Sequence, residues 1–448
     1  MTGEHGPATE LWAHGLGGQR DLPIPLDLAV SGAVAALVVS FTVLAVAWRR
    51  PRYDAATSGR PAPAWLDALV SSTALLVVAR VFGLFLAGFT AFAAVFGQDT
   101  YINPFFGIVA VWLWVGIVPA SLLLGRFWRA ISPFRTVLWL FSKAAGTDPD
   151  EGLARYPERL GLWPAAFGLY AFVWLELVNN FSSLGGVRLW FALYCAAMVL
   201  GSAVYGGRFL ERADPFEVYS TLVAHLSPWG RRDGHVVLRS PLANLDTLPA
   251  LPGLVVVVGV LFGSTGFDSF RESPTFVTFV QGSSIDGQML LNLGLLTFCV
   301  GATVVFAVGT MLTGLGDDEH RVRRTALPDL YAHSVVPIIV GYVAAHYLTY
   351  LFEIGSRTLQ QAGDPLSNGS NLLGLADITE ISWFSYHPTL LATLKVLFVV
   401  VGHVVGAVAA HDRALKLLPA KHHLTGQLPL LVAMVFFTSG GLYLLFSA

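Results

Sequence analysis

The stretch from Leu28 to Trp48 reads LAVSGAVAALVVSFTVLAVAW and contains no charged residue. One helical crossing of a lipid bilayer needs about 20 consecutive apolar residues, so this stretch has the length of one crossing. Arg49-Arg50-Pro51-Arg52 follows it directly, and basic residues beside a transmembrane helix favour the cytoplasmic side. The stretch therefore predicts a transmembrane helix that ends at the inner membrane surface.

Apolar stretches of similar length recur along the whole chain. The ten candidate spans are 28–48, 69–96, 105–125, 161–180, 188–206, 251–267, 288–312, 331–352, 389–411 and 428–446. Charged residues make up only 12% of the chain, against about 25% in an average soluble protein, which is too few to cover a soluble surface. The sequence thus predicts an all-α fold, a polytopic transmembrane helix bundle in contact with the lipid bilayer.

The distribution of basic residues predicts the orientation of this bundle. If the N-terminus lies outside, 21 of the 27 Lys and Arg residues fall in inner segments and four in outer segments. Because basic loops stay in the cytoplasm, both termini are expected outside, an N-out/C-out topology in a bacterial plasma membrane. The net charge of −2 argues against a nucleic-acid partner, since neutralising phosphates requires a concentrated basic surface.

The spacing of the spans divides the chain into four parts. Residues 1–27 are expected to form an outer N-terminal segment, without the apolar core of a cleavable signal peptide. Residues 28–224 make an N-terminal five-helix half. A cytoplasmic linker with several Pro, Gly and Arg residues covers 225–250. Residues 251–448 make a C-terminal five-helix half that carries most of the histidines.

The N-terminal half contains a repeated pattern. The segment from Gly125 to Phe134 aligns without a gap with the segment from Gly207 to Phe216, 82 residues later. Each follows an out-to-in span and ends in Ser-Pro or Asp-Pro, which is typical of a helix N-cap followed by proline at the first helical position. We therefore predict a duplicated hairpin, with Gly125 matching Gly207, and a short helix along the inner surface after each copy.

The eighth span presents three polar residues at helical spacing. His346, Tyr350 and Glu353 stand at i, i+4 and i+7, which predicts that they project from one helical face near the outer end. Ionisable groups at membrane depth cost free energy, so each is a candidate functional residue. The set offers an imidazole, a phenol and a carboxylate, and Tyr350 and Glu353 are candidate catalytic groups. Interfacial anchoring of the tyrosine and the glutamate is the alternative.

Three further polar residues are expected at a comparable depth. Glu176 closes the fourth span, Asp268 closes the sixth and His387 precedes the ninth. Together with His346 they predict an outward-facing vestibule. Histidine and carboxylate ligands suit a divalent metal such as zinc or copper, so His346, His387 and Asp268 are the candidate metal ligands and Glu176 or Glu353 the candidate base. Buried ion pairing is the alternative for Glu176 and Asp268.

Two other histidines suggest different cofactors. His403 lies beside the small residues Gly402 and Gly406 in the ninth span, and it could hold a haem together with His346. His14 could bind copper through its ring and a free amine if the chain were cut before it. The alternative for the segment around His14 is an ordinary glycine-rich entry to the first span.

Four segments resemble one bacterial family. They are residues 14–25, the run Gly263-Ser264-Thr265-Gly266-Phe267-Asp268, residues 333–347 and residues 402–415. The resemblance is to the polytopic actinobacterial membrane proteins that are commonly named fenitrothion hydrolase, and it covers nearly the whole chain. Members of that family often begin with a signal sequence that ends before the histidine-glycine pair, whereas this chain carries a short hydrophilic leader.

The resemblance implies a membrane-bound hydrolase of organophosphorus esters. It also implies a lipophilic small-molecule substrate and a second membrane subunit as partner. It brings no catalytic residues with it. Two other functions stay open on the residues alone, a transporter or metal-handling permease with a path lined by histidines, and a haem-binding subunit of a redox or assembly system.

Overall fold

The structure is a computed structural model that describes residues 19–179, 181, 183–314, 322–419, 422–423 and 425–447. Its elements up to the linker are η1 (Gln19–Asp21), α1 (Leu26–Ala47), β1 (Arg60–Pro61), α2 (Ala64–Val70), α3 (Thr73–Phe96), α4 (Pro104–Gly107), η2 (Ile108–Val115), α5 (Ile117–Leu124), α6 (Phe127–Ile131), α7 (Pro133–Ala145), η3 (Glu158–Leu160), α8 (Trp163–Leu177), α9 (Leu184–Tyr205), α10 (Gly207–Ala213) and α11 (Pro215–Ala224).

The elements that follow complete the chain. They are β2 (Trp229–Arg232), β3 (His235–Leu238), α12 (Pro241–Leu245), α13 (Leu254–Arg271), α14 (Pro274–Gly282), α15 (Gly287–Met311), η4 (Arg324–Ala326), α16 (Leu327–Tyr331), η5 (Ala332–Val335), α17 (Val336–His346), η6 (Tyr350–Ile354), α18 (Gly355–Gln361), α19 (Pro388–Leu417), η8 (Thr425–Gln427) and α20 (Leu428–Ser447).

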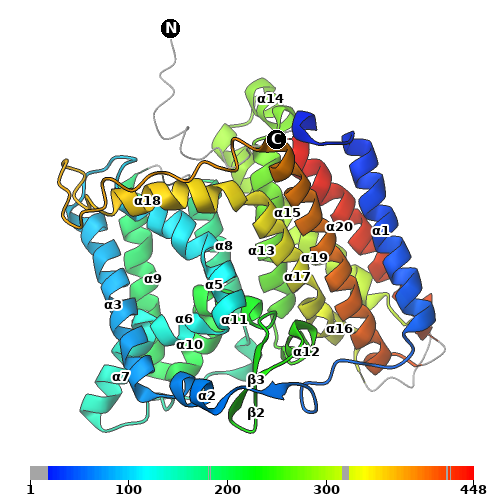
Figure 1. The fold of residues 1–448 in the computed structure, drawn as a ribbon, viewed down its shortest axis with the longest axis horizontal. Helices are drawn as coiled ribbons and strands as arrows, with labels where there is room; N and C mark the ends of the chain where they lie inside the picture. Colours follow the sequence, from blue (N-terminus) through cyan, green and yellow to red (C-terminus); the bar gives the residue numbers. More distant parts are fainter. Residues whose placement is uncertain are drawn as a thin grey trace.

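The predicted all-α membrane bundle is confirmed. Within the described residues nine helices are long and apolar enough to cross a membrane. A tenth span consists of Pro104–Val115 and Ile117–Leu124, which meet at a bend of 42°. Each of the ten predicted stretches corresponds to one of these spans. The helix α1 begins and α20 ends on the same side of the bundle (Figure 1), which fits an even number of crossings. We call this side the outer face, following the basic residues.

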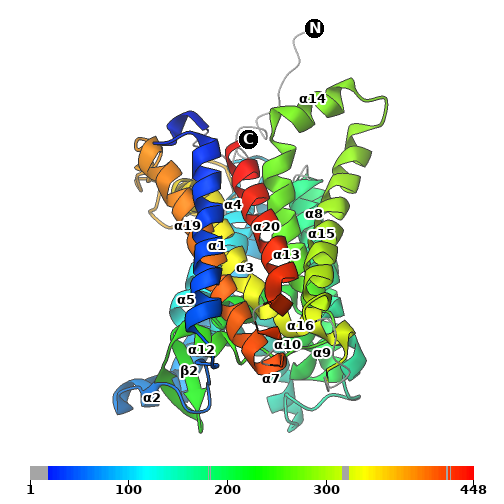
Figure 2. The same cartoon turned by 90° about the vertical axis from the view of Figure 1, so that its right-hand side faces the viewer.

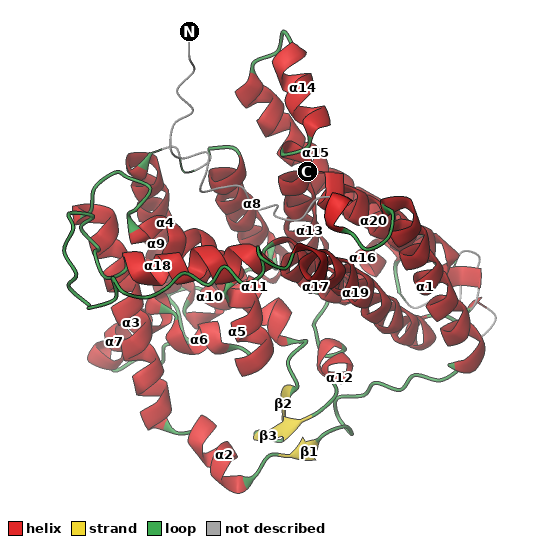
Figure 3. Cartoon of the chain, turned by 45° about the horizontal axis from the view of Figure 1, so that its top comes forward, coloured by secondary structure: helices red, strands yellow, loops and turns green. Residues whose placement is uncertain are grey.

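The helices form two groups that stand side by side (Figure 1, Figure 3). One group holds α3, α5, α8, α9 and the short helices α6, α10 and α11. The other holds α13, α15, α17, α19 and α20, and α8 and α13 form the main contact between the groups. The first span, α1, packs on α19 and α20, so it lies with the C-terminal helices and not with the N-terminal half in which the sequence boundary placed it.

The inner face is closed by a small sheet and by ion pairs. The strand order is β1-β3-β2, with both pairs antiparallel, so the loop after α1 joins the predicted linker 225–250. Figure 2 shows this sheet below the helices, beside α2 and α12. Asp246 follows α12 and binds Arg413 and Lys416 at the inner end of α19, at 3.2 and 2.7 Å. The linker is therefore fixed to the C-terminal group.

The repeated pattern is present, with one difference from the prediction. Ser132 and Asp214 cap α7 and α11 by accepting hydrogen bonds from backbone N–H groups, and each is followed by proline. The left-handed glycine before the second copy is Gly206, at φ 66°, and not Gly207, so the match with Gly125 shifts by one residue at this turn. The gapless alignment therefore holds at the caps and fails at the turn that precedes them.

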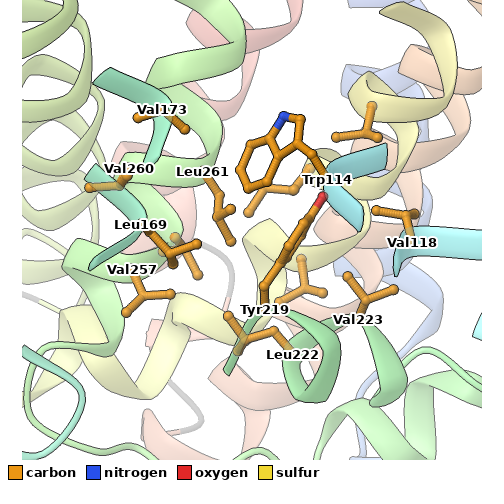
Figure 4. Packing of buried hydrophobic residues seen from close by; sticks show 14 of the residues in the cluster. Trp114, Val118, Leu169, Val173, Tyr219, Leu222, Val223, Val257, Val260 and Leu261 are labelled. Atoms are coloured by element: carbon orange, nitrogen blue, oxygen red, sulfur yellow. The ribbon is translucent and has the colours of Figure 1, made fainter. Parts of the chain in front are cut away.

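The two short helices also differ in their environment. The side of α7 that faces away from the bundle exposes Leu140 and Phe141, as expected of a helix on a membrane surface. In contrast, α11 is buried along almost its whole length and packs against α5 and α8. A short helix follows each copy as predicted, but α7 exposes one face, whereas the side chains of α11 are buried among α5, α8 and α10. Figure 4 shows one of them, Tyr219, packed against Trp114.

Two of the spans are interrupted by π-helical segments. The segment η2 leads into the bent third span, and η6 follows α17 in the eighth span. The two segments contact each other. After η6 the chain leaves the direction of α17, and α18 lies across the outer face of the N-terminal group (Figure 1). Because a π-helical turn contains more residues than an α-helical turn, the side chains of η2 and η6 point in other directions than they would in a continuous α-helix.

Candidate functional site

A buried polar network lies where the two helix groups meet. Its centre is His346, the last residue of α17, whose two ring nitrogens face consecutive residues of α13. Nε2 lies 3.0 Å from Oδ2 of Asp268, and Nδ1 lies 3.2 Å from Oγ of Ser269. All three side chains are buried. The contacts hold the imidazole ring between a carboxylate and a hydroxyl group, so both of its nitrogens are engaged.

The carboxylate of Asp268 has further partners. Tyr347 donates its hydroxyl hydrogen to Oδ2 at 2.7 Å, and Arg271 donates from Nε to Oδ1 at 2.9 Å. Arg271 also donates from Nη1 to the backbone oxygen of Leu177, at 3.0 Å, and so connects α13 to the end of α8. A buried carboxylate is tolerated when a cation and hydrogen-bond donors surround it. Asp268 meets this condition.

The carboxylate of Glu176, in α8, lacks the surrounding hydrogen-bond donors that Asp268 has within the described part of the chain. The residue is 2% exposed, and neither carboxylate oxygen has a hydrogen-bond partner among the described residues. It lies close enough to Asp268 and Arg271 for their charges to act on it, with opposite signs. A desolvated polar group without a partner costs free energy. Glu176 is therefore the most costly group of the network, and its position demands an explanation.

Aromatic side chains of η2 and α11 lie near this carboxyl group, since Tyr219 is within electrostatic range of Glu176. Trp114 of η2 packs on Tyr219 of α11, with ring centroids 5.1 Å apart. Figure 4 shows Trp114 and Tyr219 among Leu169, Val173 and Leu261 of the neighbouring helices. The residues of the network, Glu176, Asp268 and His346, are all buried.

The π-helical turn separates two residues that the sequence placed on one face. Tyr350 is buried within electrostatic range of Glu176 and Asp268. Glu353 instead accepts hydrogen bonds from the backbone N–H and the hydroxyl of Ser385, at 3.2 and 2.5 Å. A π-helix has more residues per turn than an α-helix, so the i+7 position rotates away from His346. Glu353 thus anchors the outer loop, whereas Tyr350 belongs to the network.

His387 and His403 lie outside the network. The ring of His387 is exposed at the start of α19 and stacks on Trp383, with centroids 4.3 Å apart. His403 is buried, and its Nδ1 lies 2.8 Å from the backbone oxygen of Val399. Its Nε2 has no hydrogen-bond partner among the described residues. His346 is thus brought together with Asp268 and Glu176, whereas His387 contacts Trp383.

Helix packing also separates His403 from His346. Gly402 of α19 approaches Pro337 and Gly341 of α17. His403 therefore lies near the level of the first turn of α17, and His346 about 12 Å away along the axis at about 1.5 Å per residue. One haem iron needs both imidazoles within coordination distance, so this pair does not suit a shared haem.

Two histidines at the inner ends have structural contacts. His411 lies 2.9 Å from the backbone oxygen of Trp48 through Nε2 and 3.1 Å from Gln427 through Nδ1, so it fixes the inner end of α1. The Nδ1 atom of His333 lies 3.1 Å from the backbone oxygen of Leu330. Neither residue joins the network on the other side of the membrane.

Among the described residues no group of three or more His, Cys, Asp and Glu side chains is arranged to hold a metal ion. The predicted set of His346, His387 and Asp268 is not assembled, because only two of the three meet. His14, the residue considered above for copper, lies outside the described residues.

Sequence reasoning missed several members of the network. Ser269 and Tyr347 follow predicted residues directly, and Arg271 stands three positions after Asp268, on the same helical face. Their positions near Asp268 and His346 could have indicated them. Trp114 and Tyr219 carried no such signal, because their positions depend on η2 and on the burial of α11. The chain matches no protein-family model, no curated protein and no solved structure.

Proposed function

We propose that the protein is a membrane transporter in which Glu176 takes up and releases a proton during the transport cycle. The observation that carries this proposal is the environment of its carboxyl group, which is buried and has no hydrogen-bond partner among the described residues. Carboxyl groups inside transmembrane bundles are costly and commonly belong to ion or proton pathways. A group that must change its protonation state cannot be held permanently by strong donors.

The two interrupted spans support the same proposal. Transporter sites are commonly built where transmembrane helices are broken, because the irregular backbone can line a polar cavity or change conformation. Here η2 and η6 contact each other and bring Trp114 and Tyr350 to the region of Glu176. The network also lies at the contact between the two helix groups, where a relative movement would alter its exposure.

Polar groups continue from Glu176 toward both faces. On the outer side are Asp268 and Arg271, which is hydrogen bonded to the end of α8. On the inner side lies Tyr219, followed one residue later by Ser220, whose hydroxyl is 2.9 Å from that of Ser121. Such hydroxyl and carboxyl groups are the components of a proton relay. They favour the movement of protons over that of a large solute through this region.

The proposal can be tested with the purified protein in liposomes. The probe is a pH-sensitive dye trapped inside, and a potassium gradient with valinomycin makes the interior negative. We expect the wild-type protein to acidify the interior and Glu176→Gln to abolish most of that flux, because the amide cannot exchange a proton. Glu353→Gln is the matched control, since Glu353 binds Ser385 of the outer loop. Equal flux in wild type and Glu176→Gln, or no flux in wild type, would contradict the proposal.

A second function is favoured by a specific observation, the chain Ser269–His346–Asp268. A serine, a histidine and a carboxylate in hydrogen-bonded series form the arrangement that serine hydrolases use, although here the carboxylate faces Nε2. In the hydrolase suggested by the family resemblance, Ser269 Oγ would add to the phosphorus of a lipophilic ester. The aryloxide would leave, and His346 would take the hydroxyl proton. Water would then release the phosphoryl group from the serine.

A fluorophosphonate probe distinguishes this second function. Labelling that is lost in Ser269→Ala and His346→Ala, but kept in His422→Ala, would favour the hydrolase. A metal-assisted version with zinc or copper would require His346 to exchange Asp268 or Ser269 for the ion, and elemental analysis of the purified protein tests it. An absorbance spectrum tests for haem. The bacterial plasma membrane and a second membrane subunit stay proposals that rest on the resemblance.

A further inference from the structure

A groove lies on the outer half of the bundle between the start of α1 and the end of α20, away from the network. Its volume is about 870 Å³, and it is open to the surface. The lining residues are Arg20, Pro25, Leu26, Asp27, Val30, Ser31, Ser439 and Tyr443. The set combines two opposite charges, three hydroxyl groups and an apolar remainder.

The surroundings of the groove are those of a lipid-facing surface. Below it, α1 exposes Val39 and Val43, and α20 exposes Val432 and Phe436. Exposed apolar side chains at this depth of a transmembrane bundle contact acyl chains. Asp27 lies in the first turn of α1 and Arg20 lies in η1, just before that helix, at the level where headgroups are found. A molecule in the groove would therefore extend from the headgroup region into the apolar layer.

The charges indicate which headgroup suits the groove. Arg20 matches a phosphate, with which a guanidinium forms charge-assisted hydrogen bonds. Asp27 matches an ammonium group that can donate hydrogen bonds. A purely anionic headgroup would meet repulsion from Asp27, and a choline headgroup has no N–H to donate. A phosphate and a primary ammonium together are the headgroup of phosphatidylethanolamine.

Contacts with α19 fix the backbone that carries Arg20. Arg20 lies in η1, which contacts α19. The neighbouring residue Asp21 interacts electrostatically with Lys395, a buried residue of α19. The short η1 segment is therefore fixed to the bundle, and the Arg20 side chain extends from a fixed backbone toward α20.

We propose that this groove binds one molecule of phosphatidylethanolamine, with its phosphate at Arg20, its ammonium at Asp27 and an acyl chain along the seam of α1 and α20. A lipid there would contact both the first span and the last, which already pack against each other. The inference is independent of the proton site, because none of the groove residues belongs to the network.

Native mass spectrometry of the full-length protein, exchanged into mixed micelles with phosphatidylethanolamine, phosphatidylcholine or phosphatidylglycerol, tests the proposal. We expect preferential retention of one phosphatidylethanolamine. Arg20→Gln should weaken retention about fivefold, since one basic side chain contributes an interaction of about that size at a headgroup. Asp27→Asn should weaken it as well, because the ammonium group loses its carboxylate partner. Arg49→Gln, at the inner end of α1, is the matched control and should change nothing.

Three results would overturn the proposal. Equal retention of the three lipids would remove the role of the two charges. Preference for phosphatidylglycerol, with no effect of Asp27→Asn, would show recognition of phosphate alone. Retention of phosphatidylethanolamine only after removal of residues 1–18 would assign the groove to that segment of the chain. Circular dichroism and a melting curve of each variant confirm that a loss of lipid is not a loss of folding.

Discussion

Arg135 and Glu217 stand 82 positions apart, each directly after one of the two repeated segments, and form a buried ion pair. The guanidinium donates from Nε at 2.6 Å and from Nη2 at 2.5 Å to the two carboxylate oxygens. The side chains are 10% and 2% exposed. The two copies of the repeated segment are thus joined through equivalent positions, one in α7 and one in α11. This contact fixes the buried helix α11, which carries Tyr219 to the network.

The first prediction concerns this pair. Removing one partner leaves an unpaired buried charge, which costs about 3–5 kcal/mol. We expect Arg135→Met and Glu217→Gln each to lower the melting temperature in detergent. The effect should be larger for Arg135→Met, because methionine offers Glu217 no donor, whereas the amide oxygen in Glu217→Gln can still accept a hydrogen bond from Arg135. The double variant should be more stable than Arg135→Met alone. Additive losses in the double variant would mean that the two side chains do not interact.

The second prediction concerns the packing of α17 on α19. A Cβ atom at Gly341 would lie 2.4 Å from the backbone oxygen of Phe398, and one at Gly402 would lie 2.7 Å from that of Pro337. Alanine at either position must therefore push the helices apart, at a cost of about 1–3 kcal/mol. Gly440→Ala is the control, since its Cβ would meet nothing within 4 Å. Equal melting temperatures for all three variants would contradict the close packing.

The third prediction concerns pH and two buried residues near the inner face. Burial raises the pKa of Asp214 from its ordinary 3.8 to about 6, and Glu217 adds to this effect. Burial and the adjacent Arg126 lower the pKa of His225 from 6.5 to about 4. Between about pH 4 and 6 the folded state therefore binds more protons at Asp214, and fewer at His225, than the unfolded state does. Raising the pH thus removes stability through Asp214 and adds stability through His225.

Melting temperatures between pH 4 and 6.5 separate the two effects. The melting temperature of Asp214→Asn minus that of wild type should rise with pH, because the variant lacks the carboxyl group through which wild type loses stability. The melting temperature of His225→Asn minus that of wild type should fall with pH, because the variant lacks the imidazole through which wild type gains stability. Parallel curves for wild type and both variants would mean that neither residue is coupled to folding.

The fourth prediction concerns the orientation in the membrane. We expect position 323 to be cytoplasmic and position 368, in the long loop between α18 and α19, to be outside. Single cysteines at these positions, in a chain with Cys195→Ser and Cys299→Ser, should react differently with a membrane-impermeant reagent in intact cells. Labelling of position 368 alone is expected, and labelling of position 323 alone would reverse the topology. The segment 321–324 between the seventh and eighth predicted spans is expected to be cytoplasmic as a whole, and Arg321 within it lies outside the described residues.

The spans could be predicted because the length and polarity of each apolar stretch are local properties. The predicted stretch 288–312, for example, corresponds to α15 at Gly287–Met311. The partner of a span is not local, and an apolar helix such as α1 carries little information about which helices it will contact. Its position beside α19 became clear only from the contacts of His411 and Asp412 with Trp48 and Arg52.

The candidate site shows the same limit. Asp268 and His346 could be identified because ionisable residues are rare in apolar spans, and they lie in direct contact. The separation of Glu353 from Tyr350 could not be predicted, since it depends on the π-helical turn η6. The exposure of His387 likewise depends on the path of the outer loop. Residue type therefore indicated candidates, whereas backbone irregularity decided which of them meet.

The most direct test of a proton-exchanging Glu176 is infrared difference spectroscopy of the purified protein during a pH titration. The C=O stretching band of a protonated carboxyl group should change with pH, shift in heavy water and be absent in Glu176→Gln, while Glu353→Gln retains it. This result would identify Glu176 as a group that exchanges its proton with the solvent. An identical set of carboxyl bands in wild type and Glu176→Gln would contradict the account.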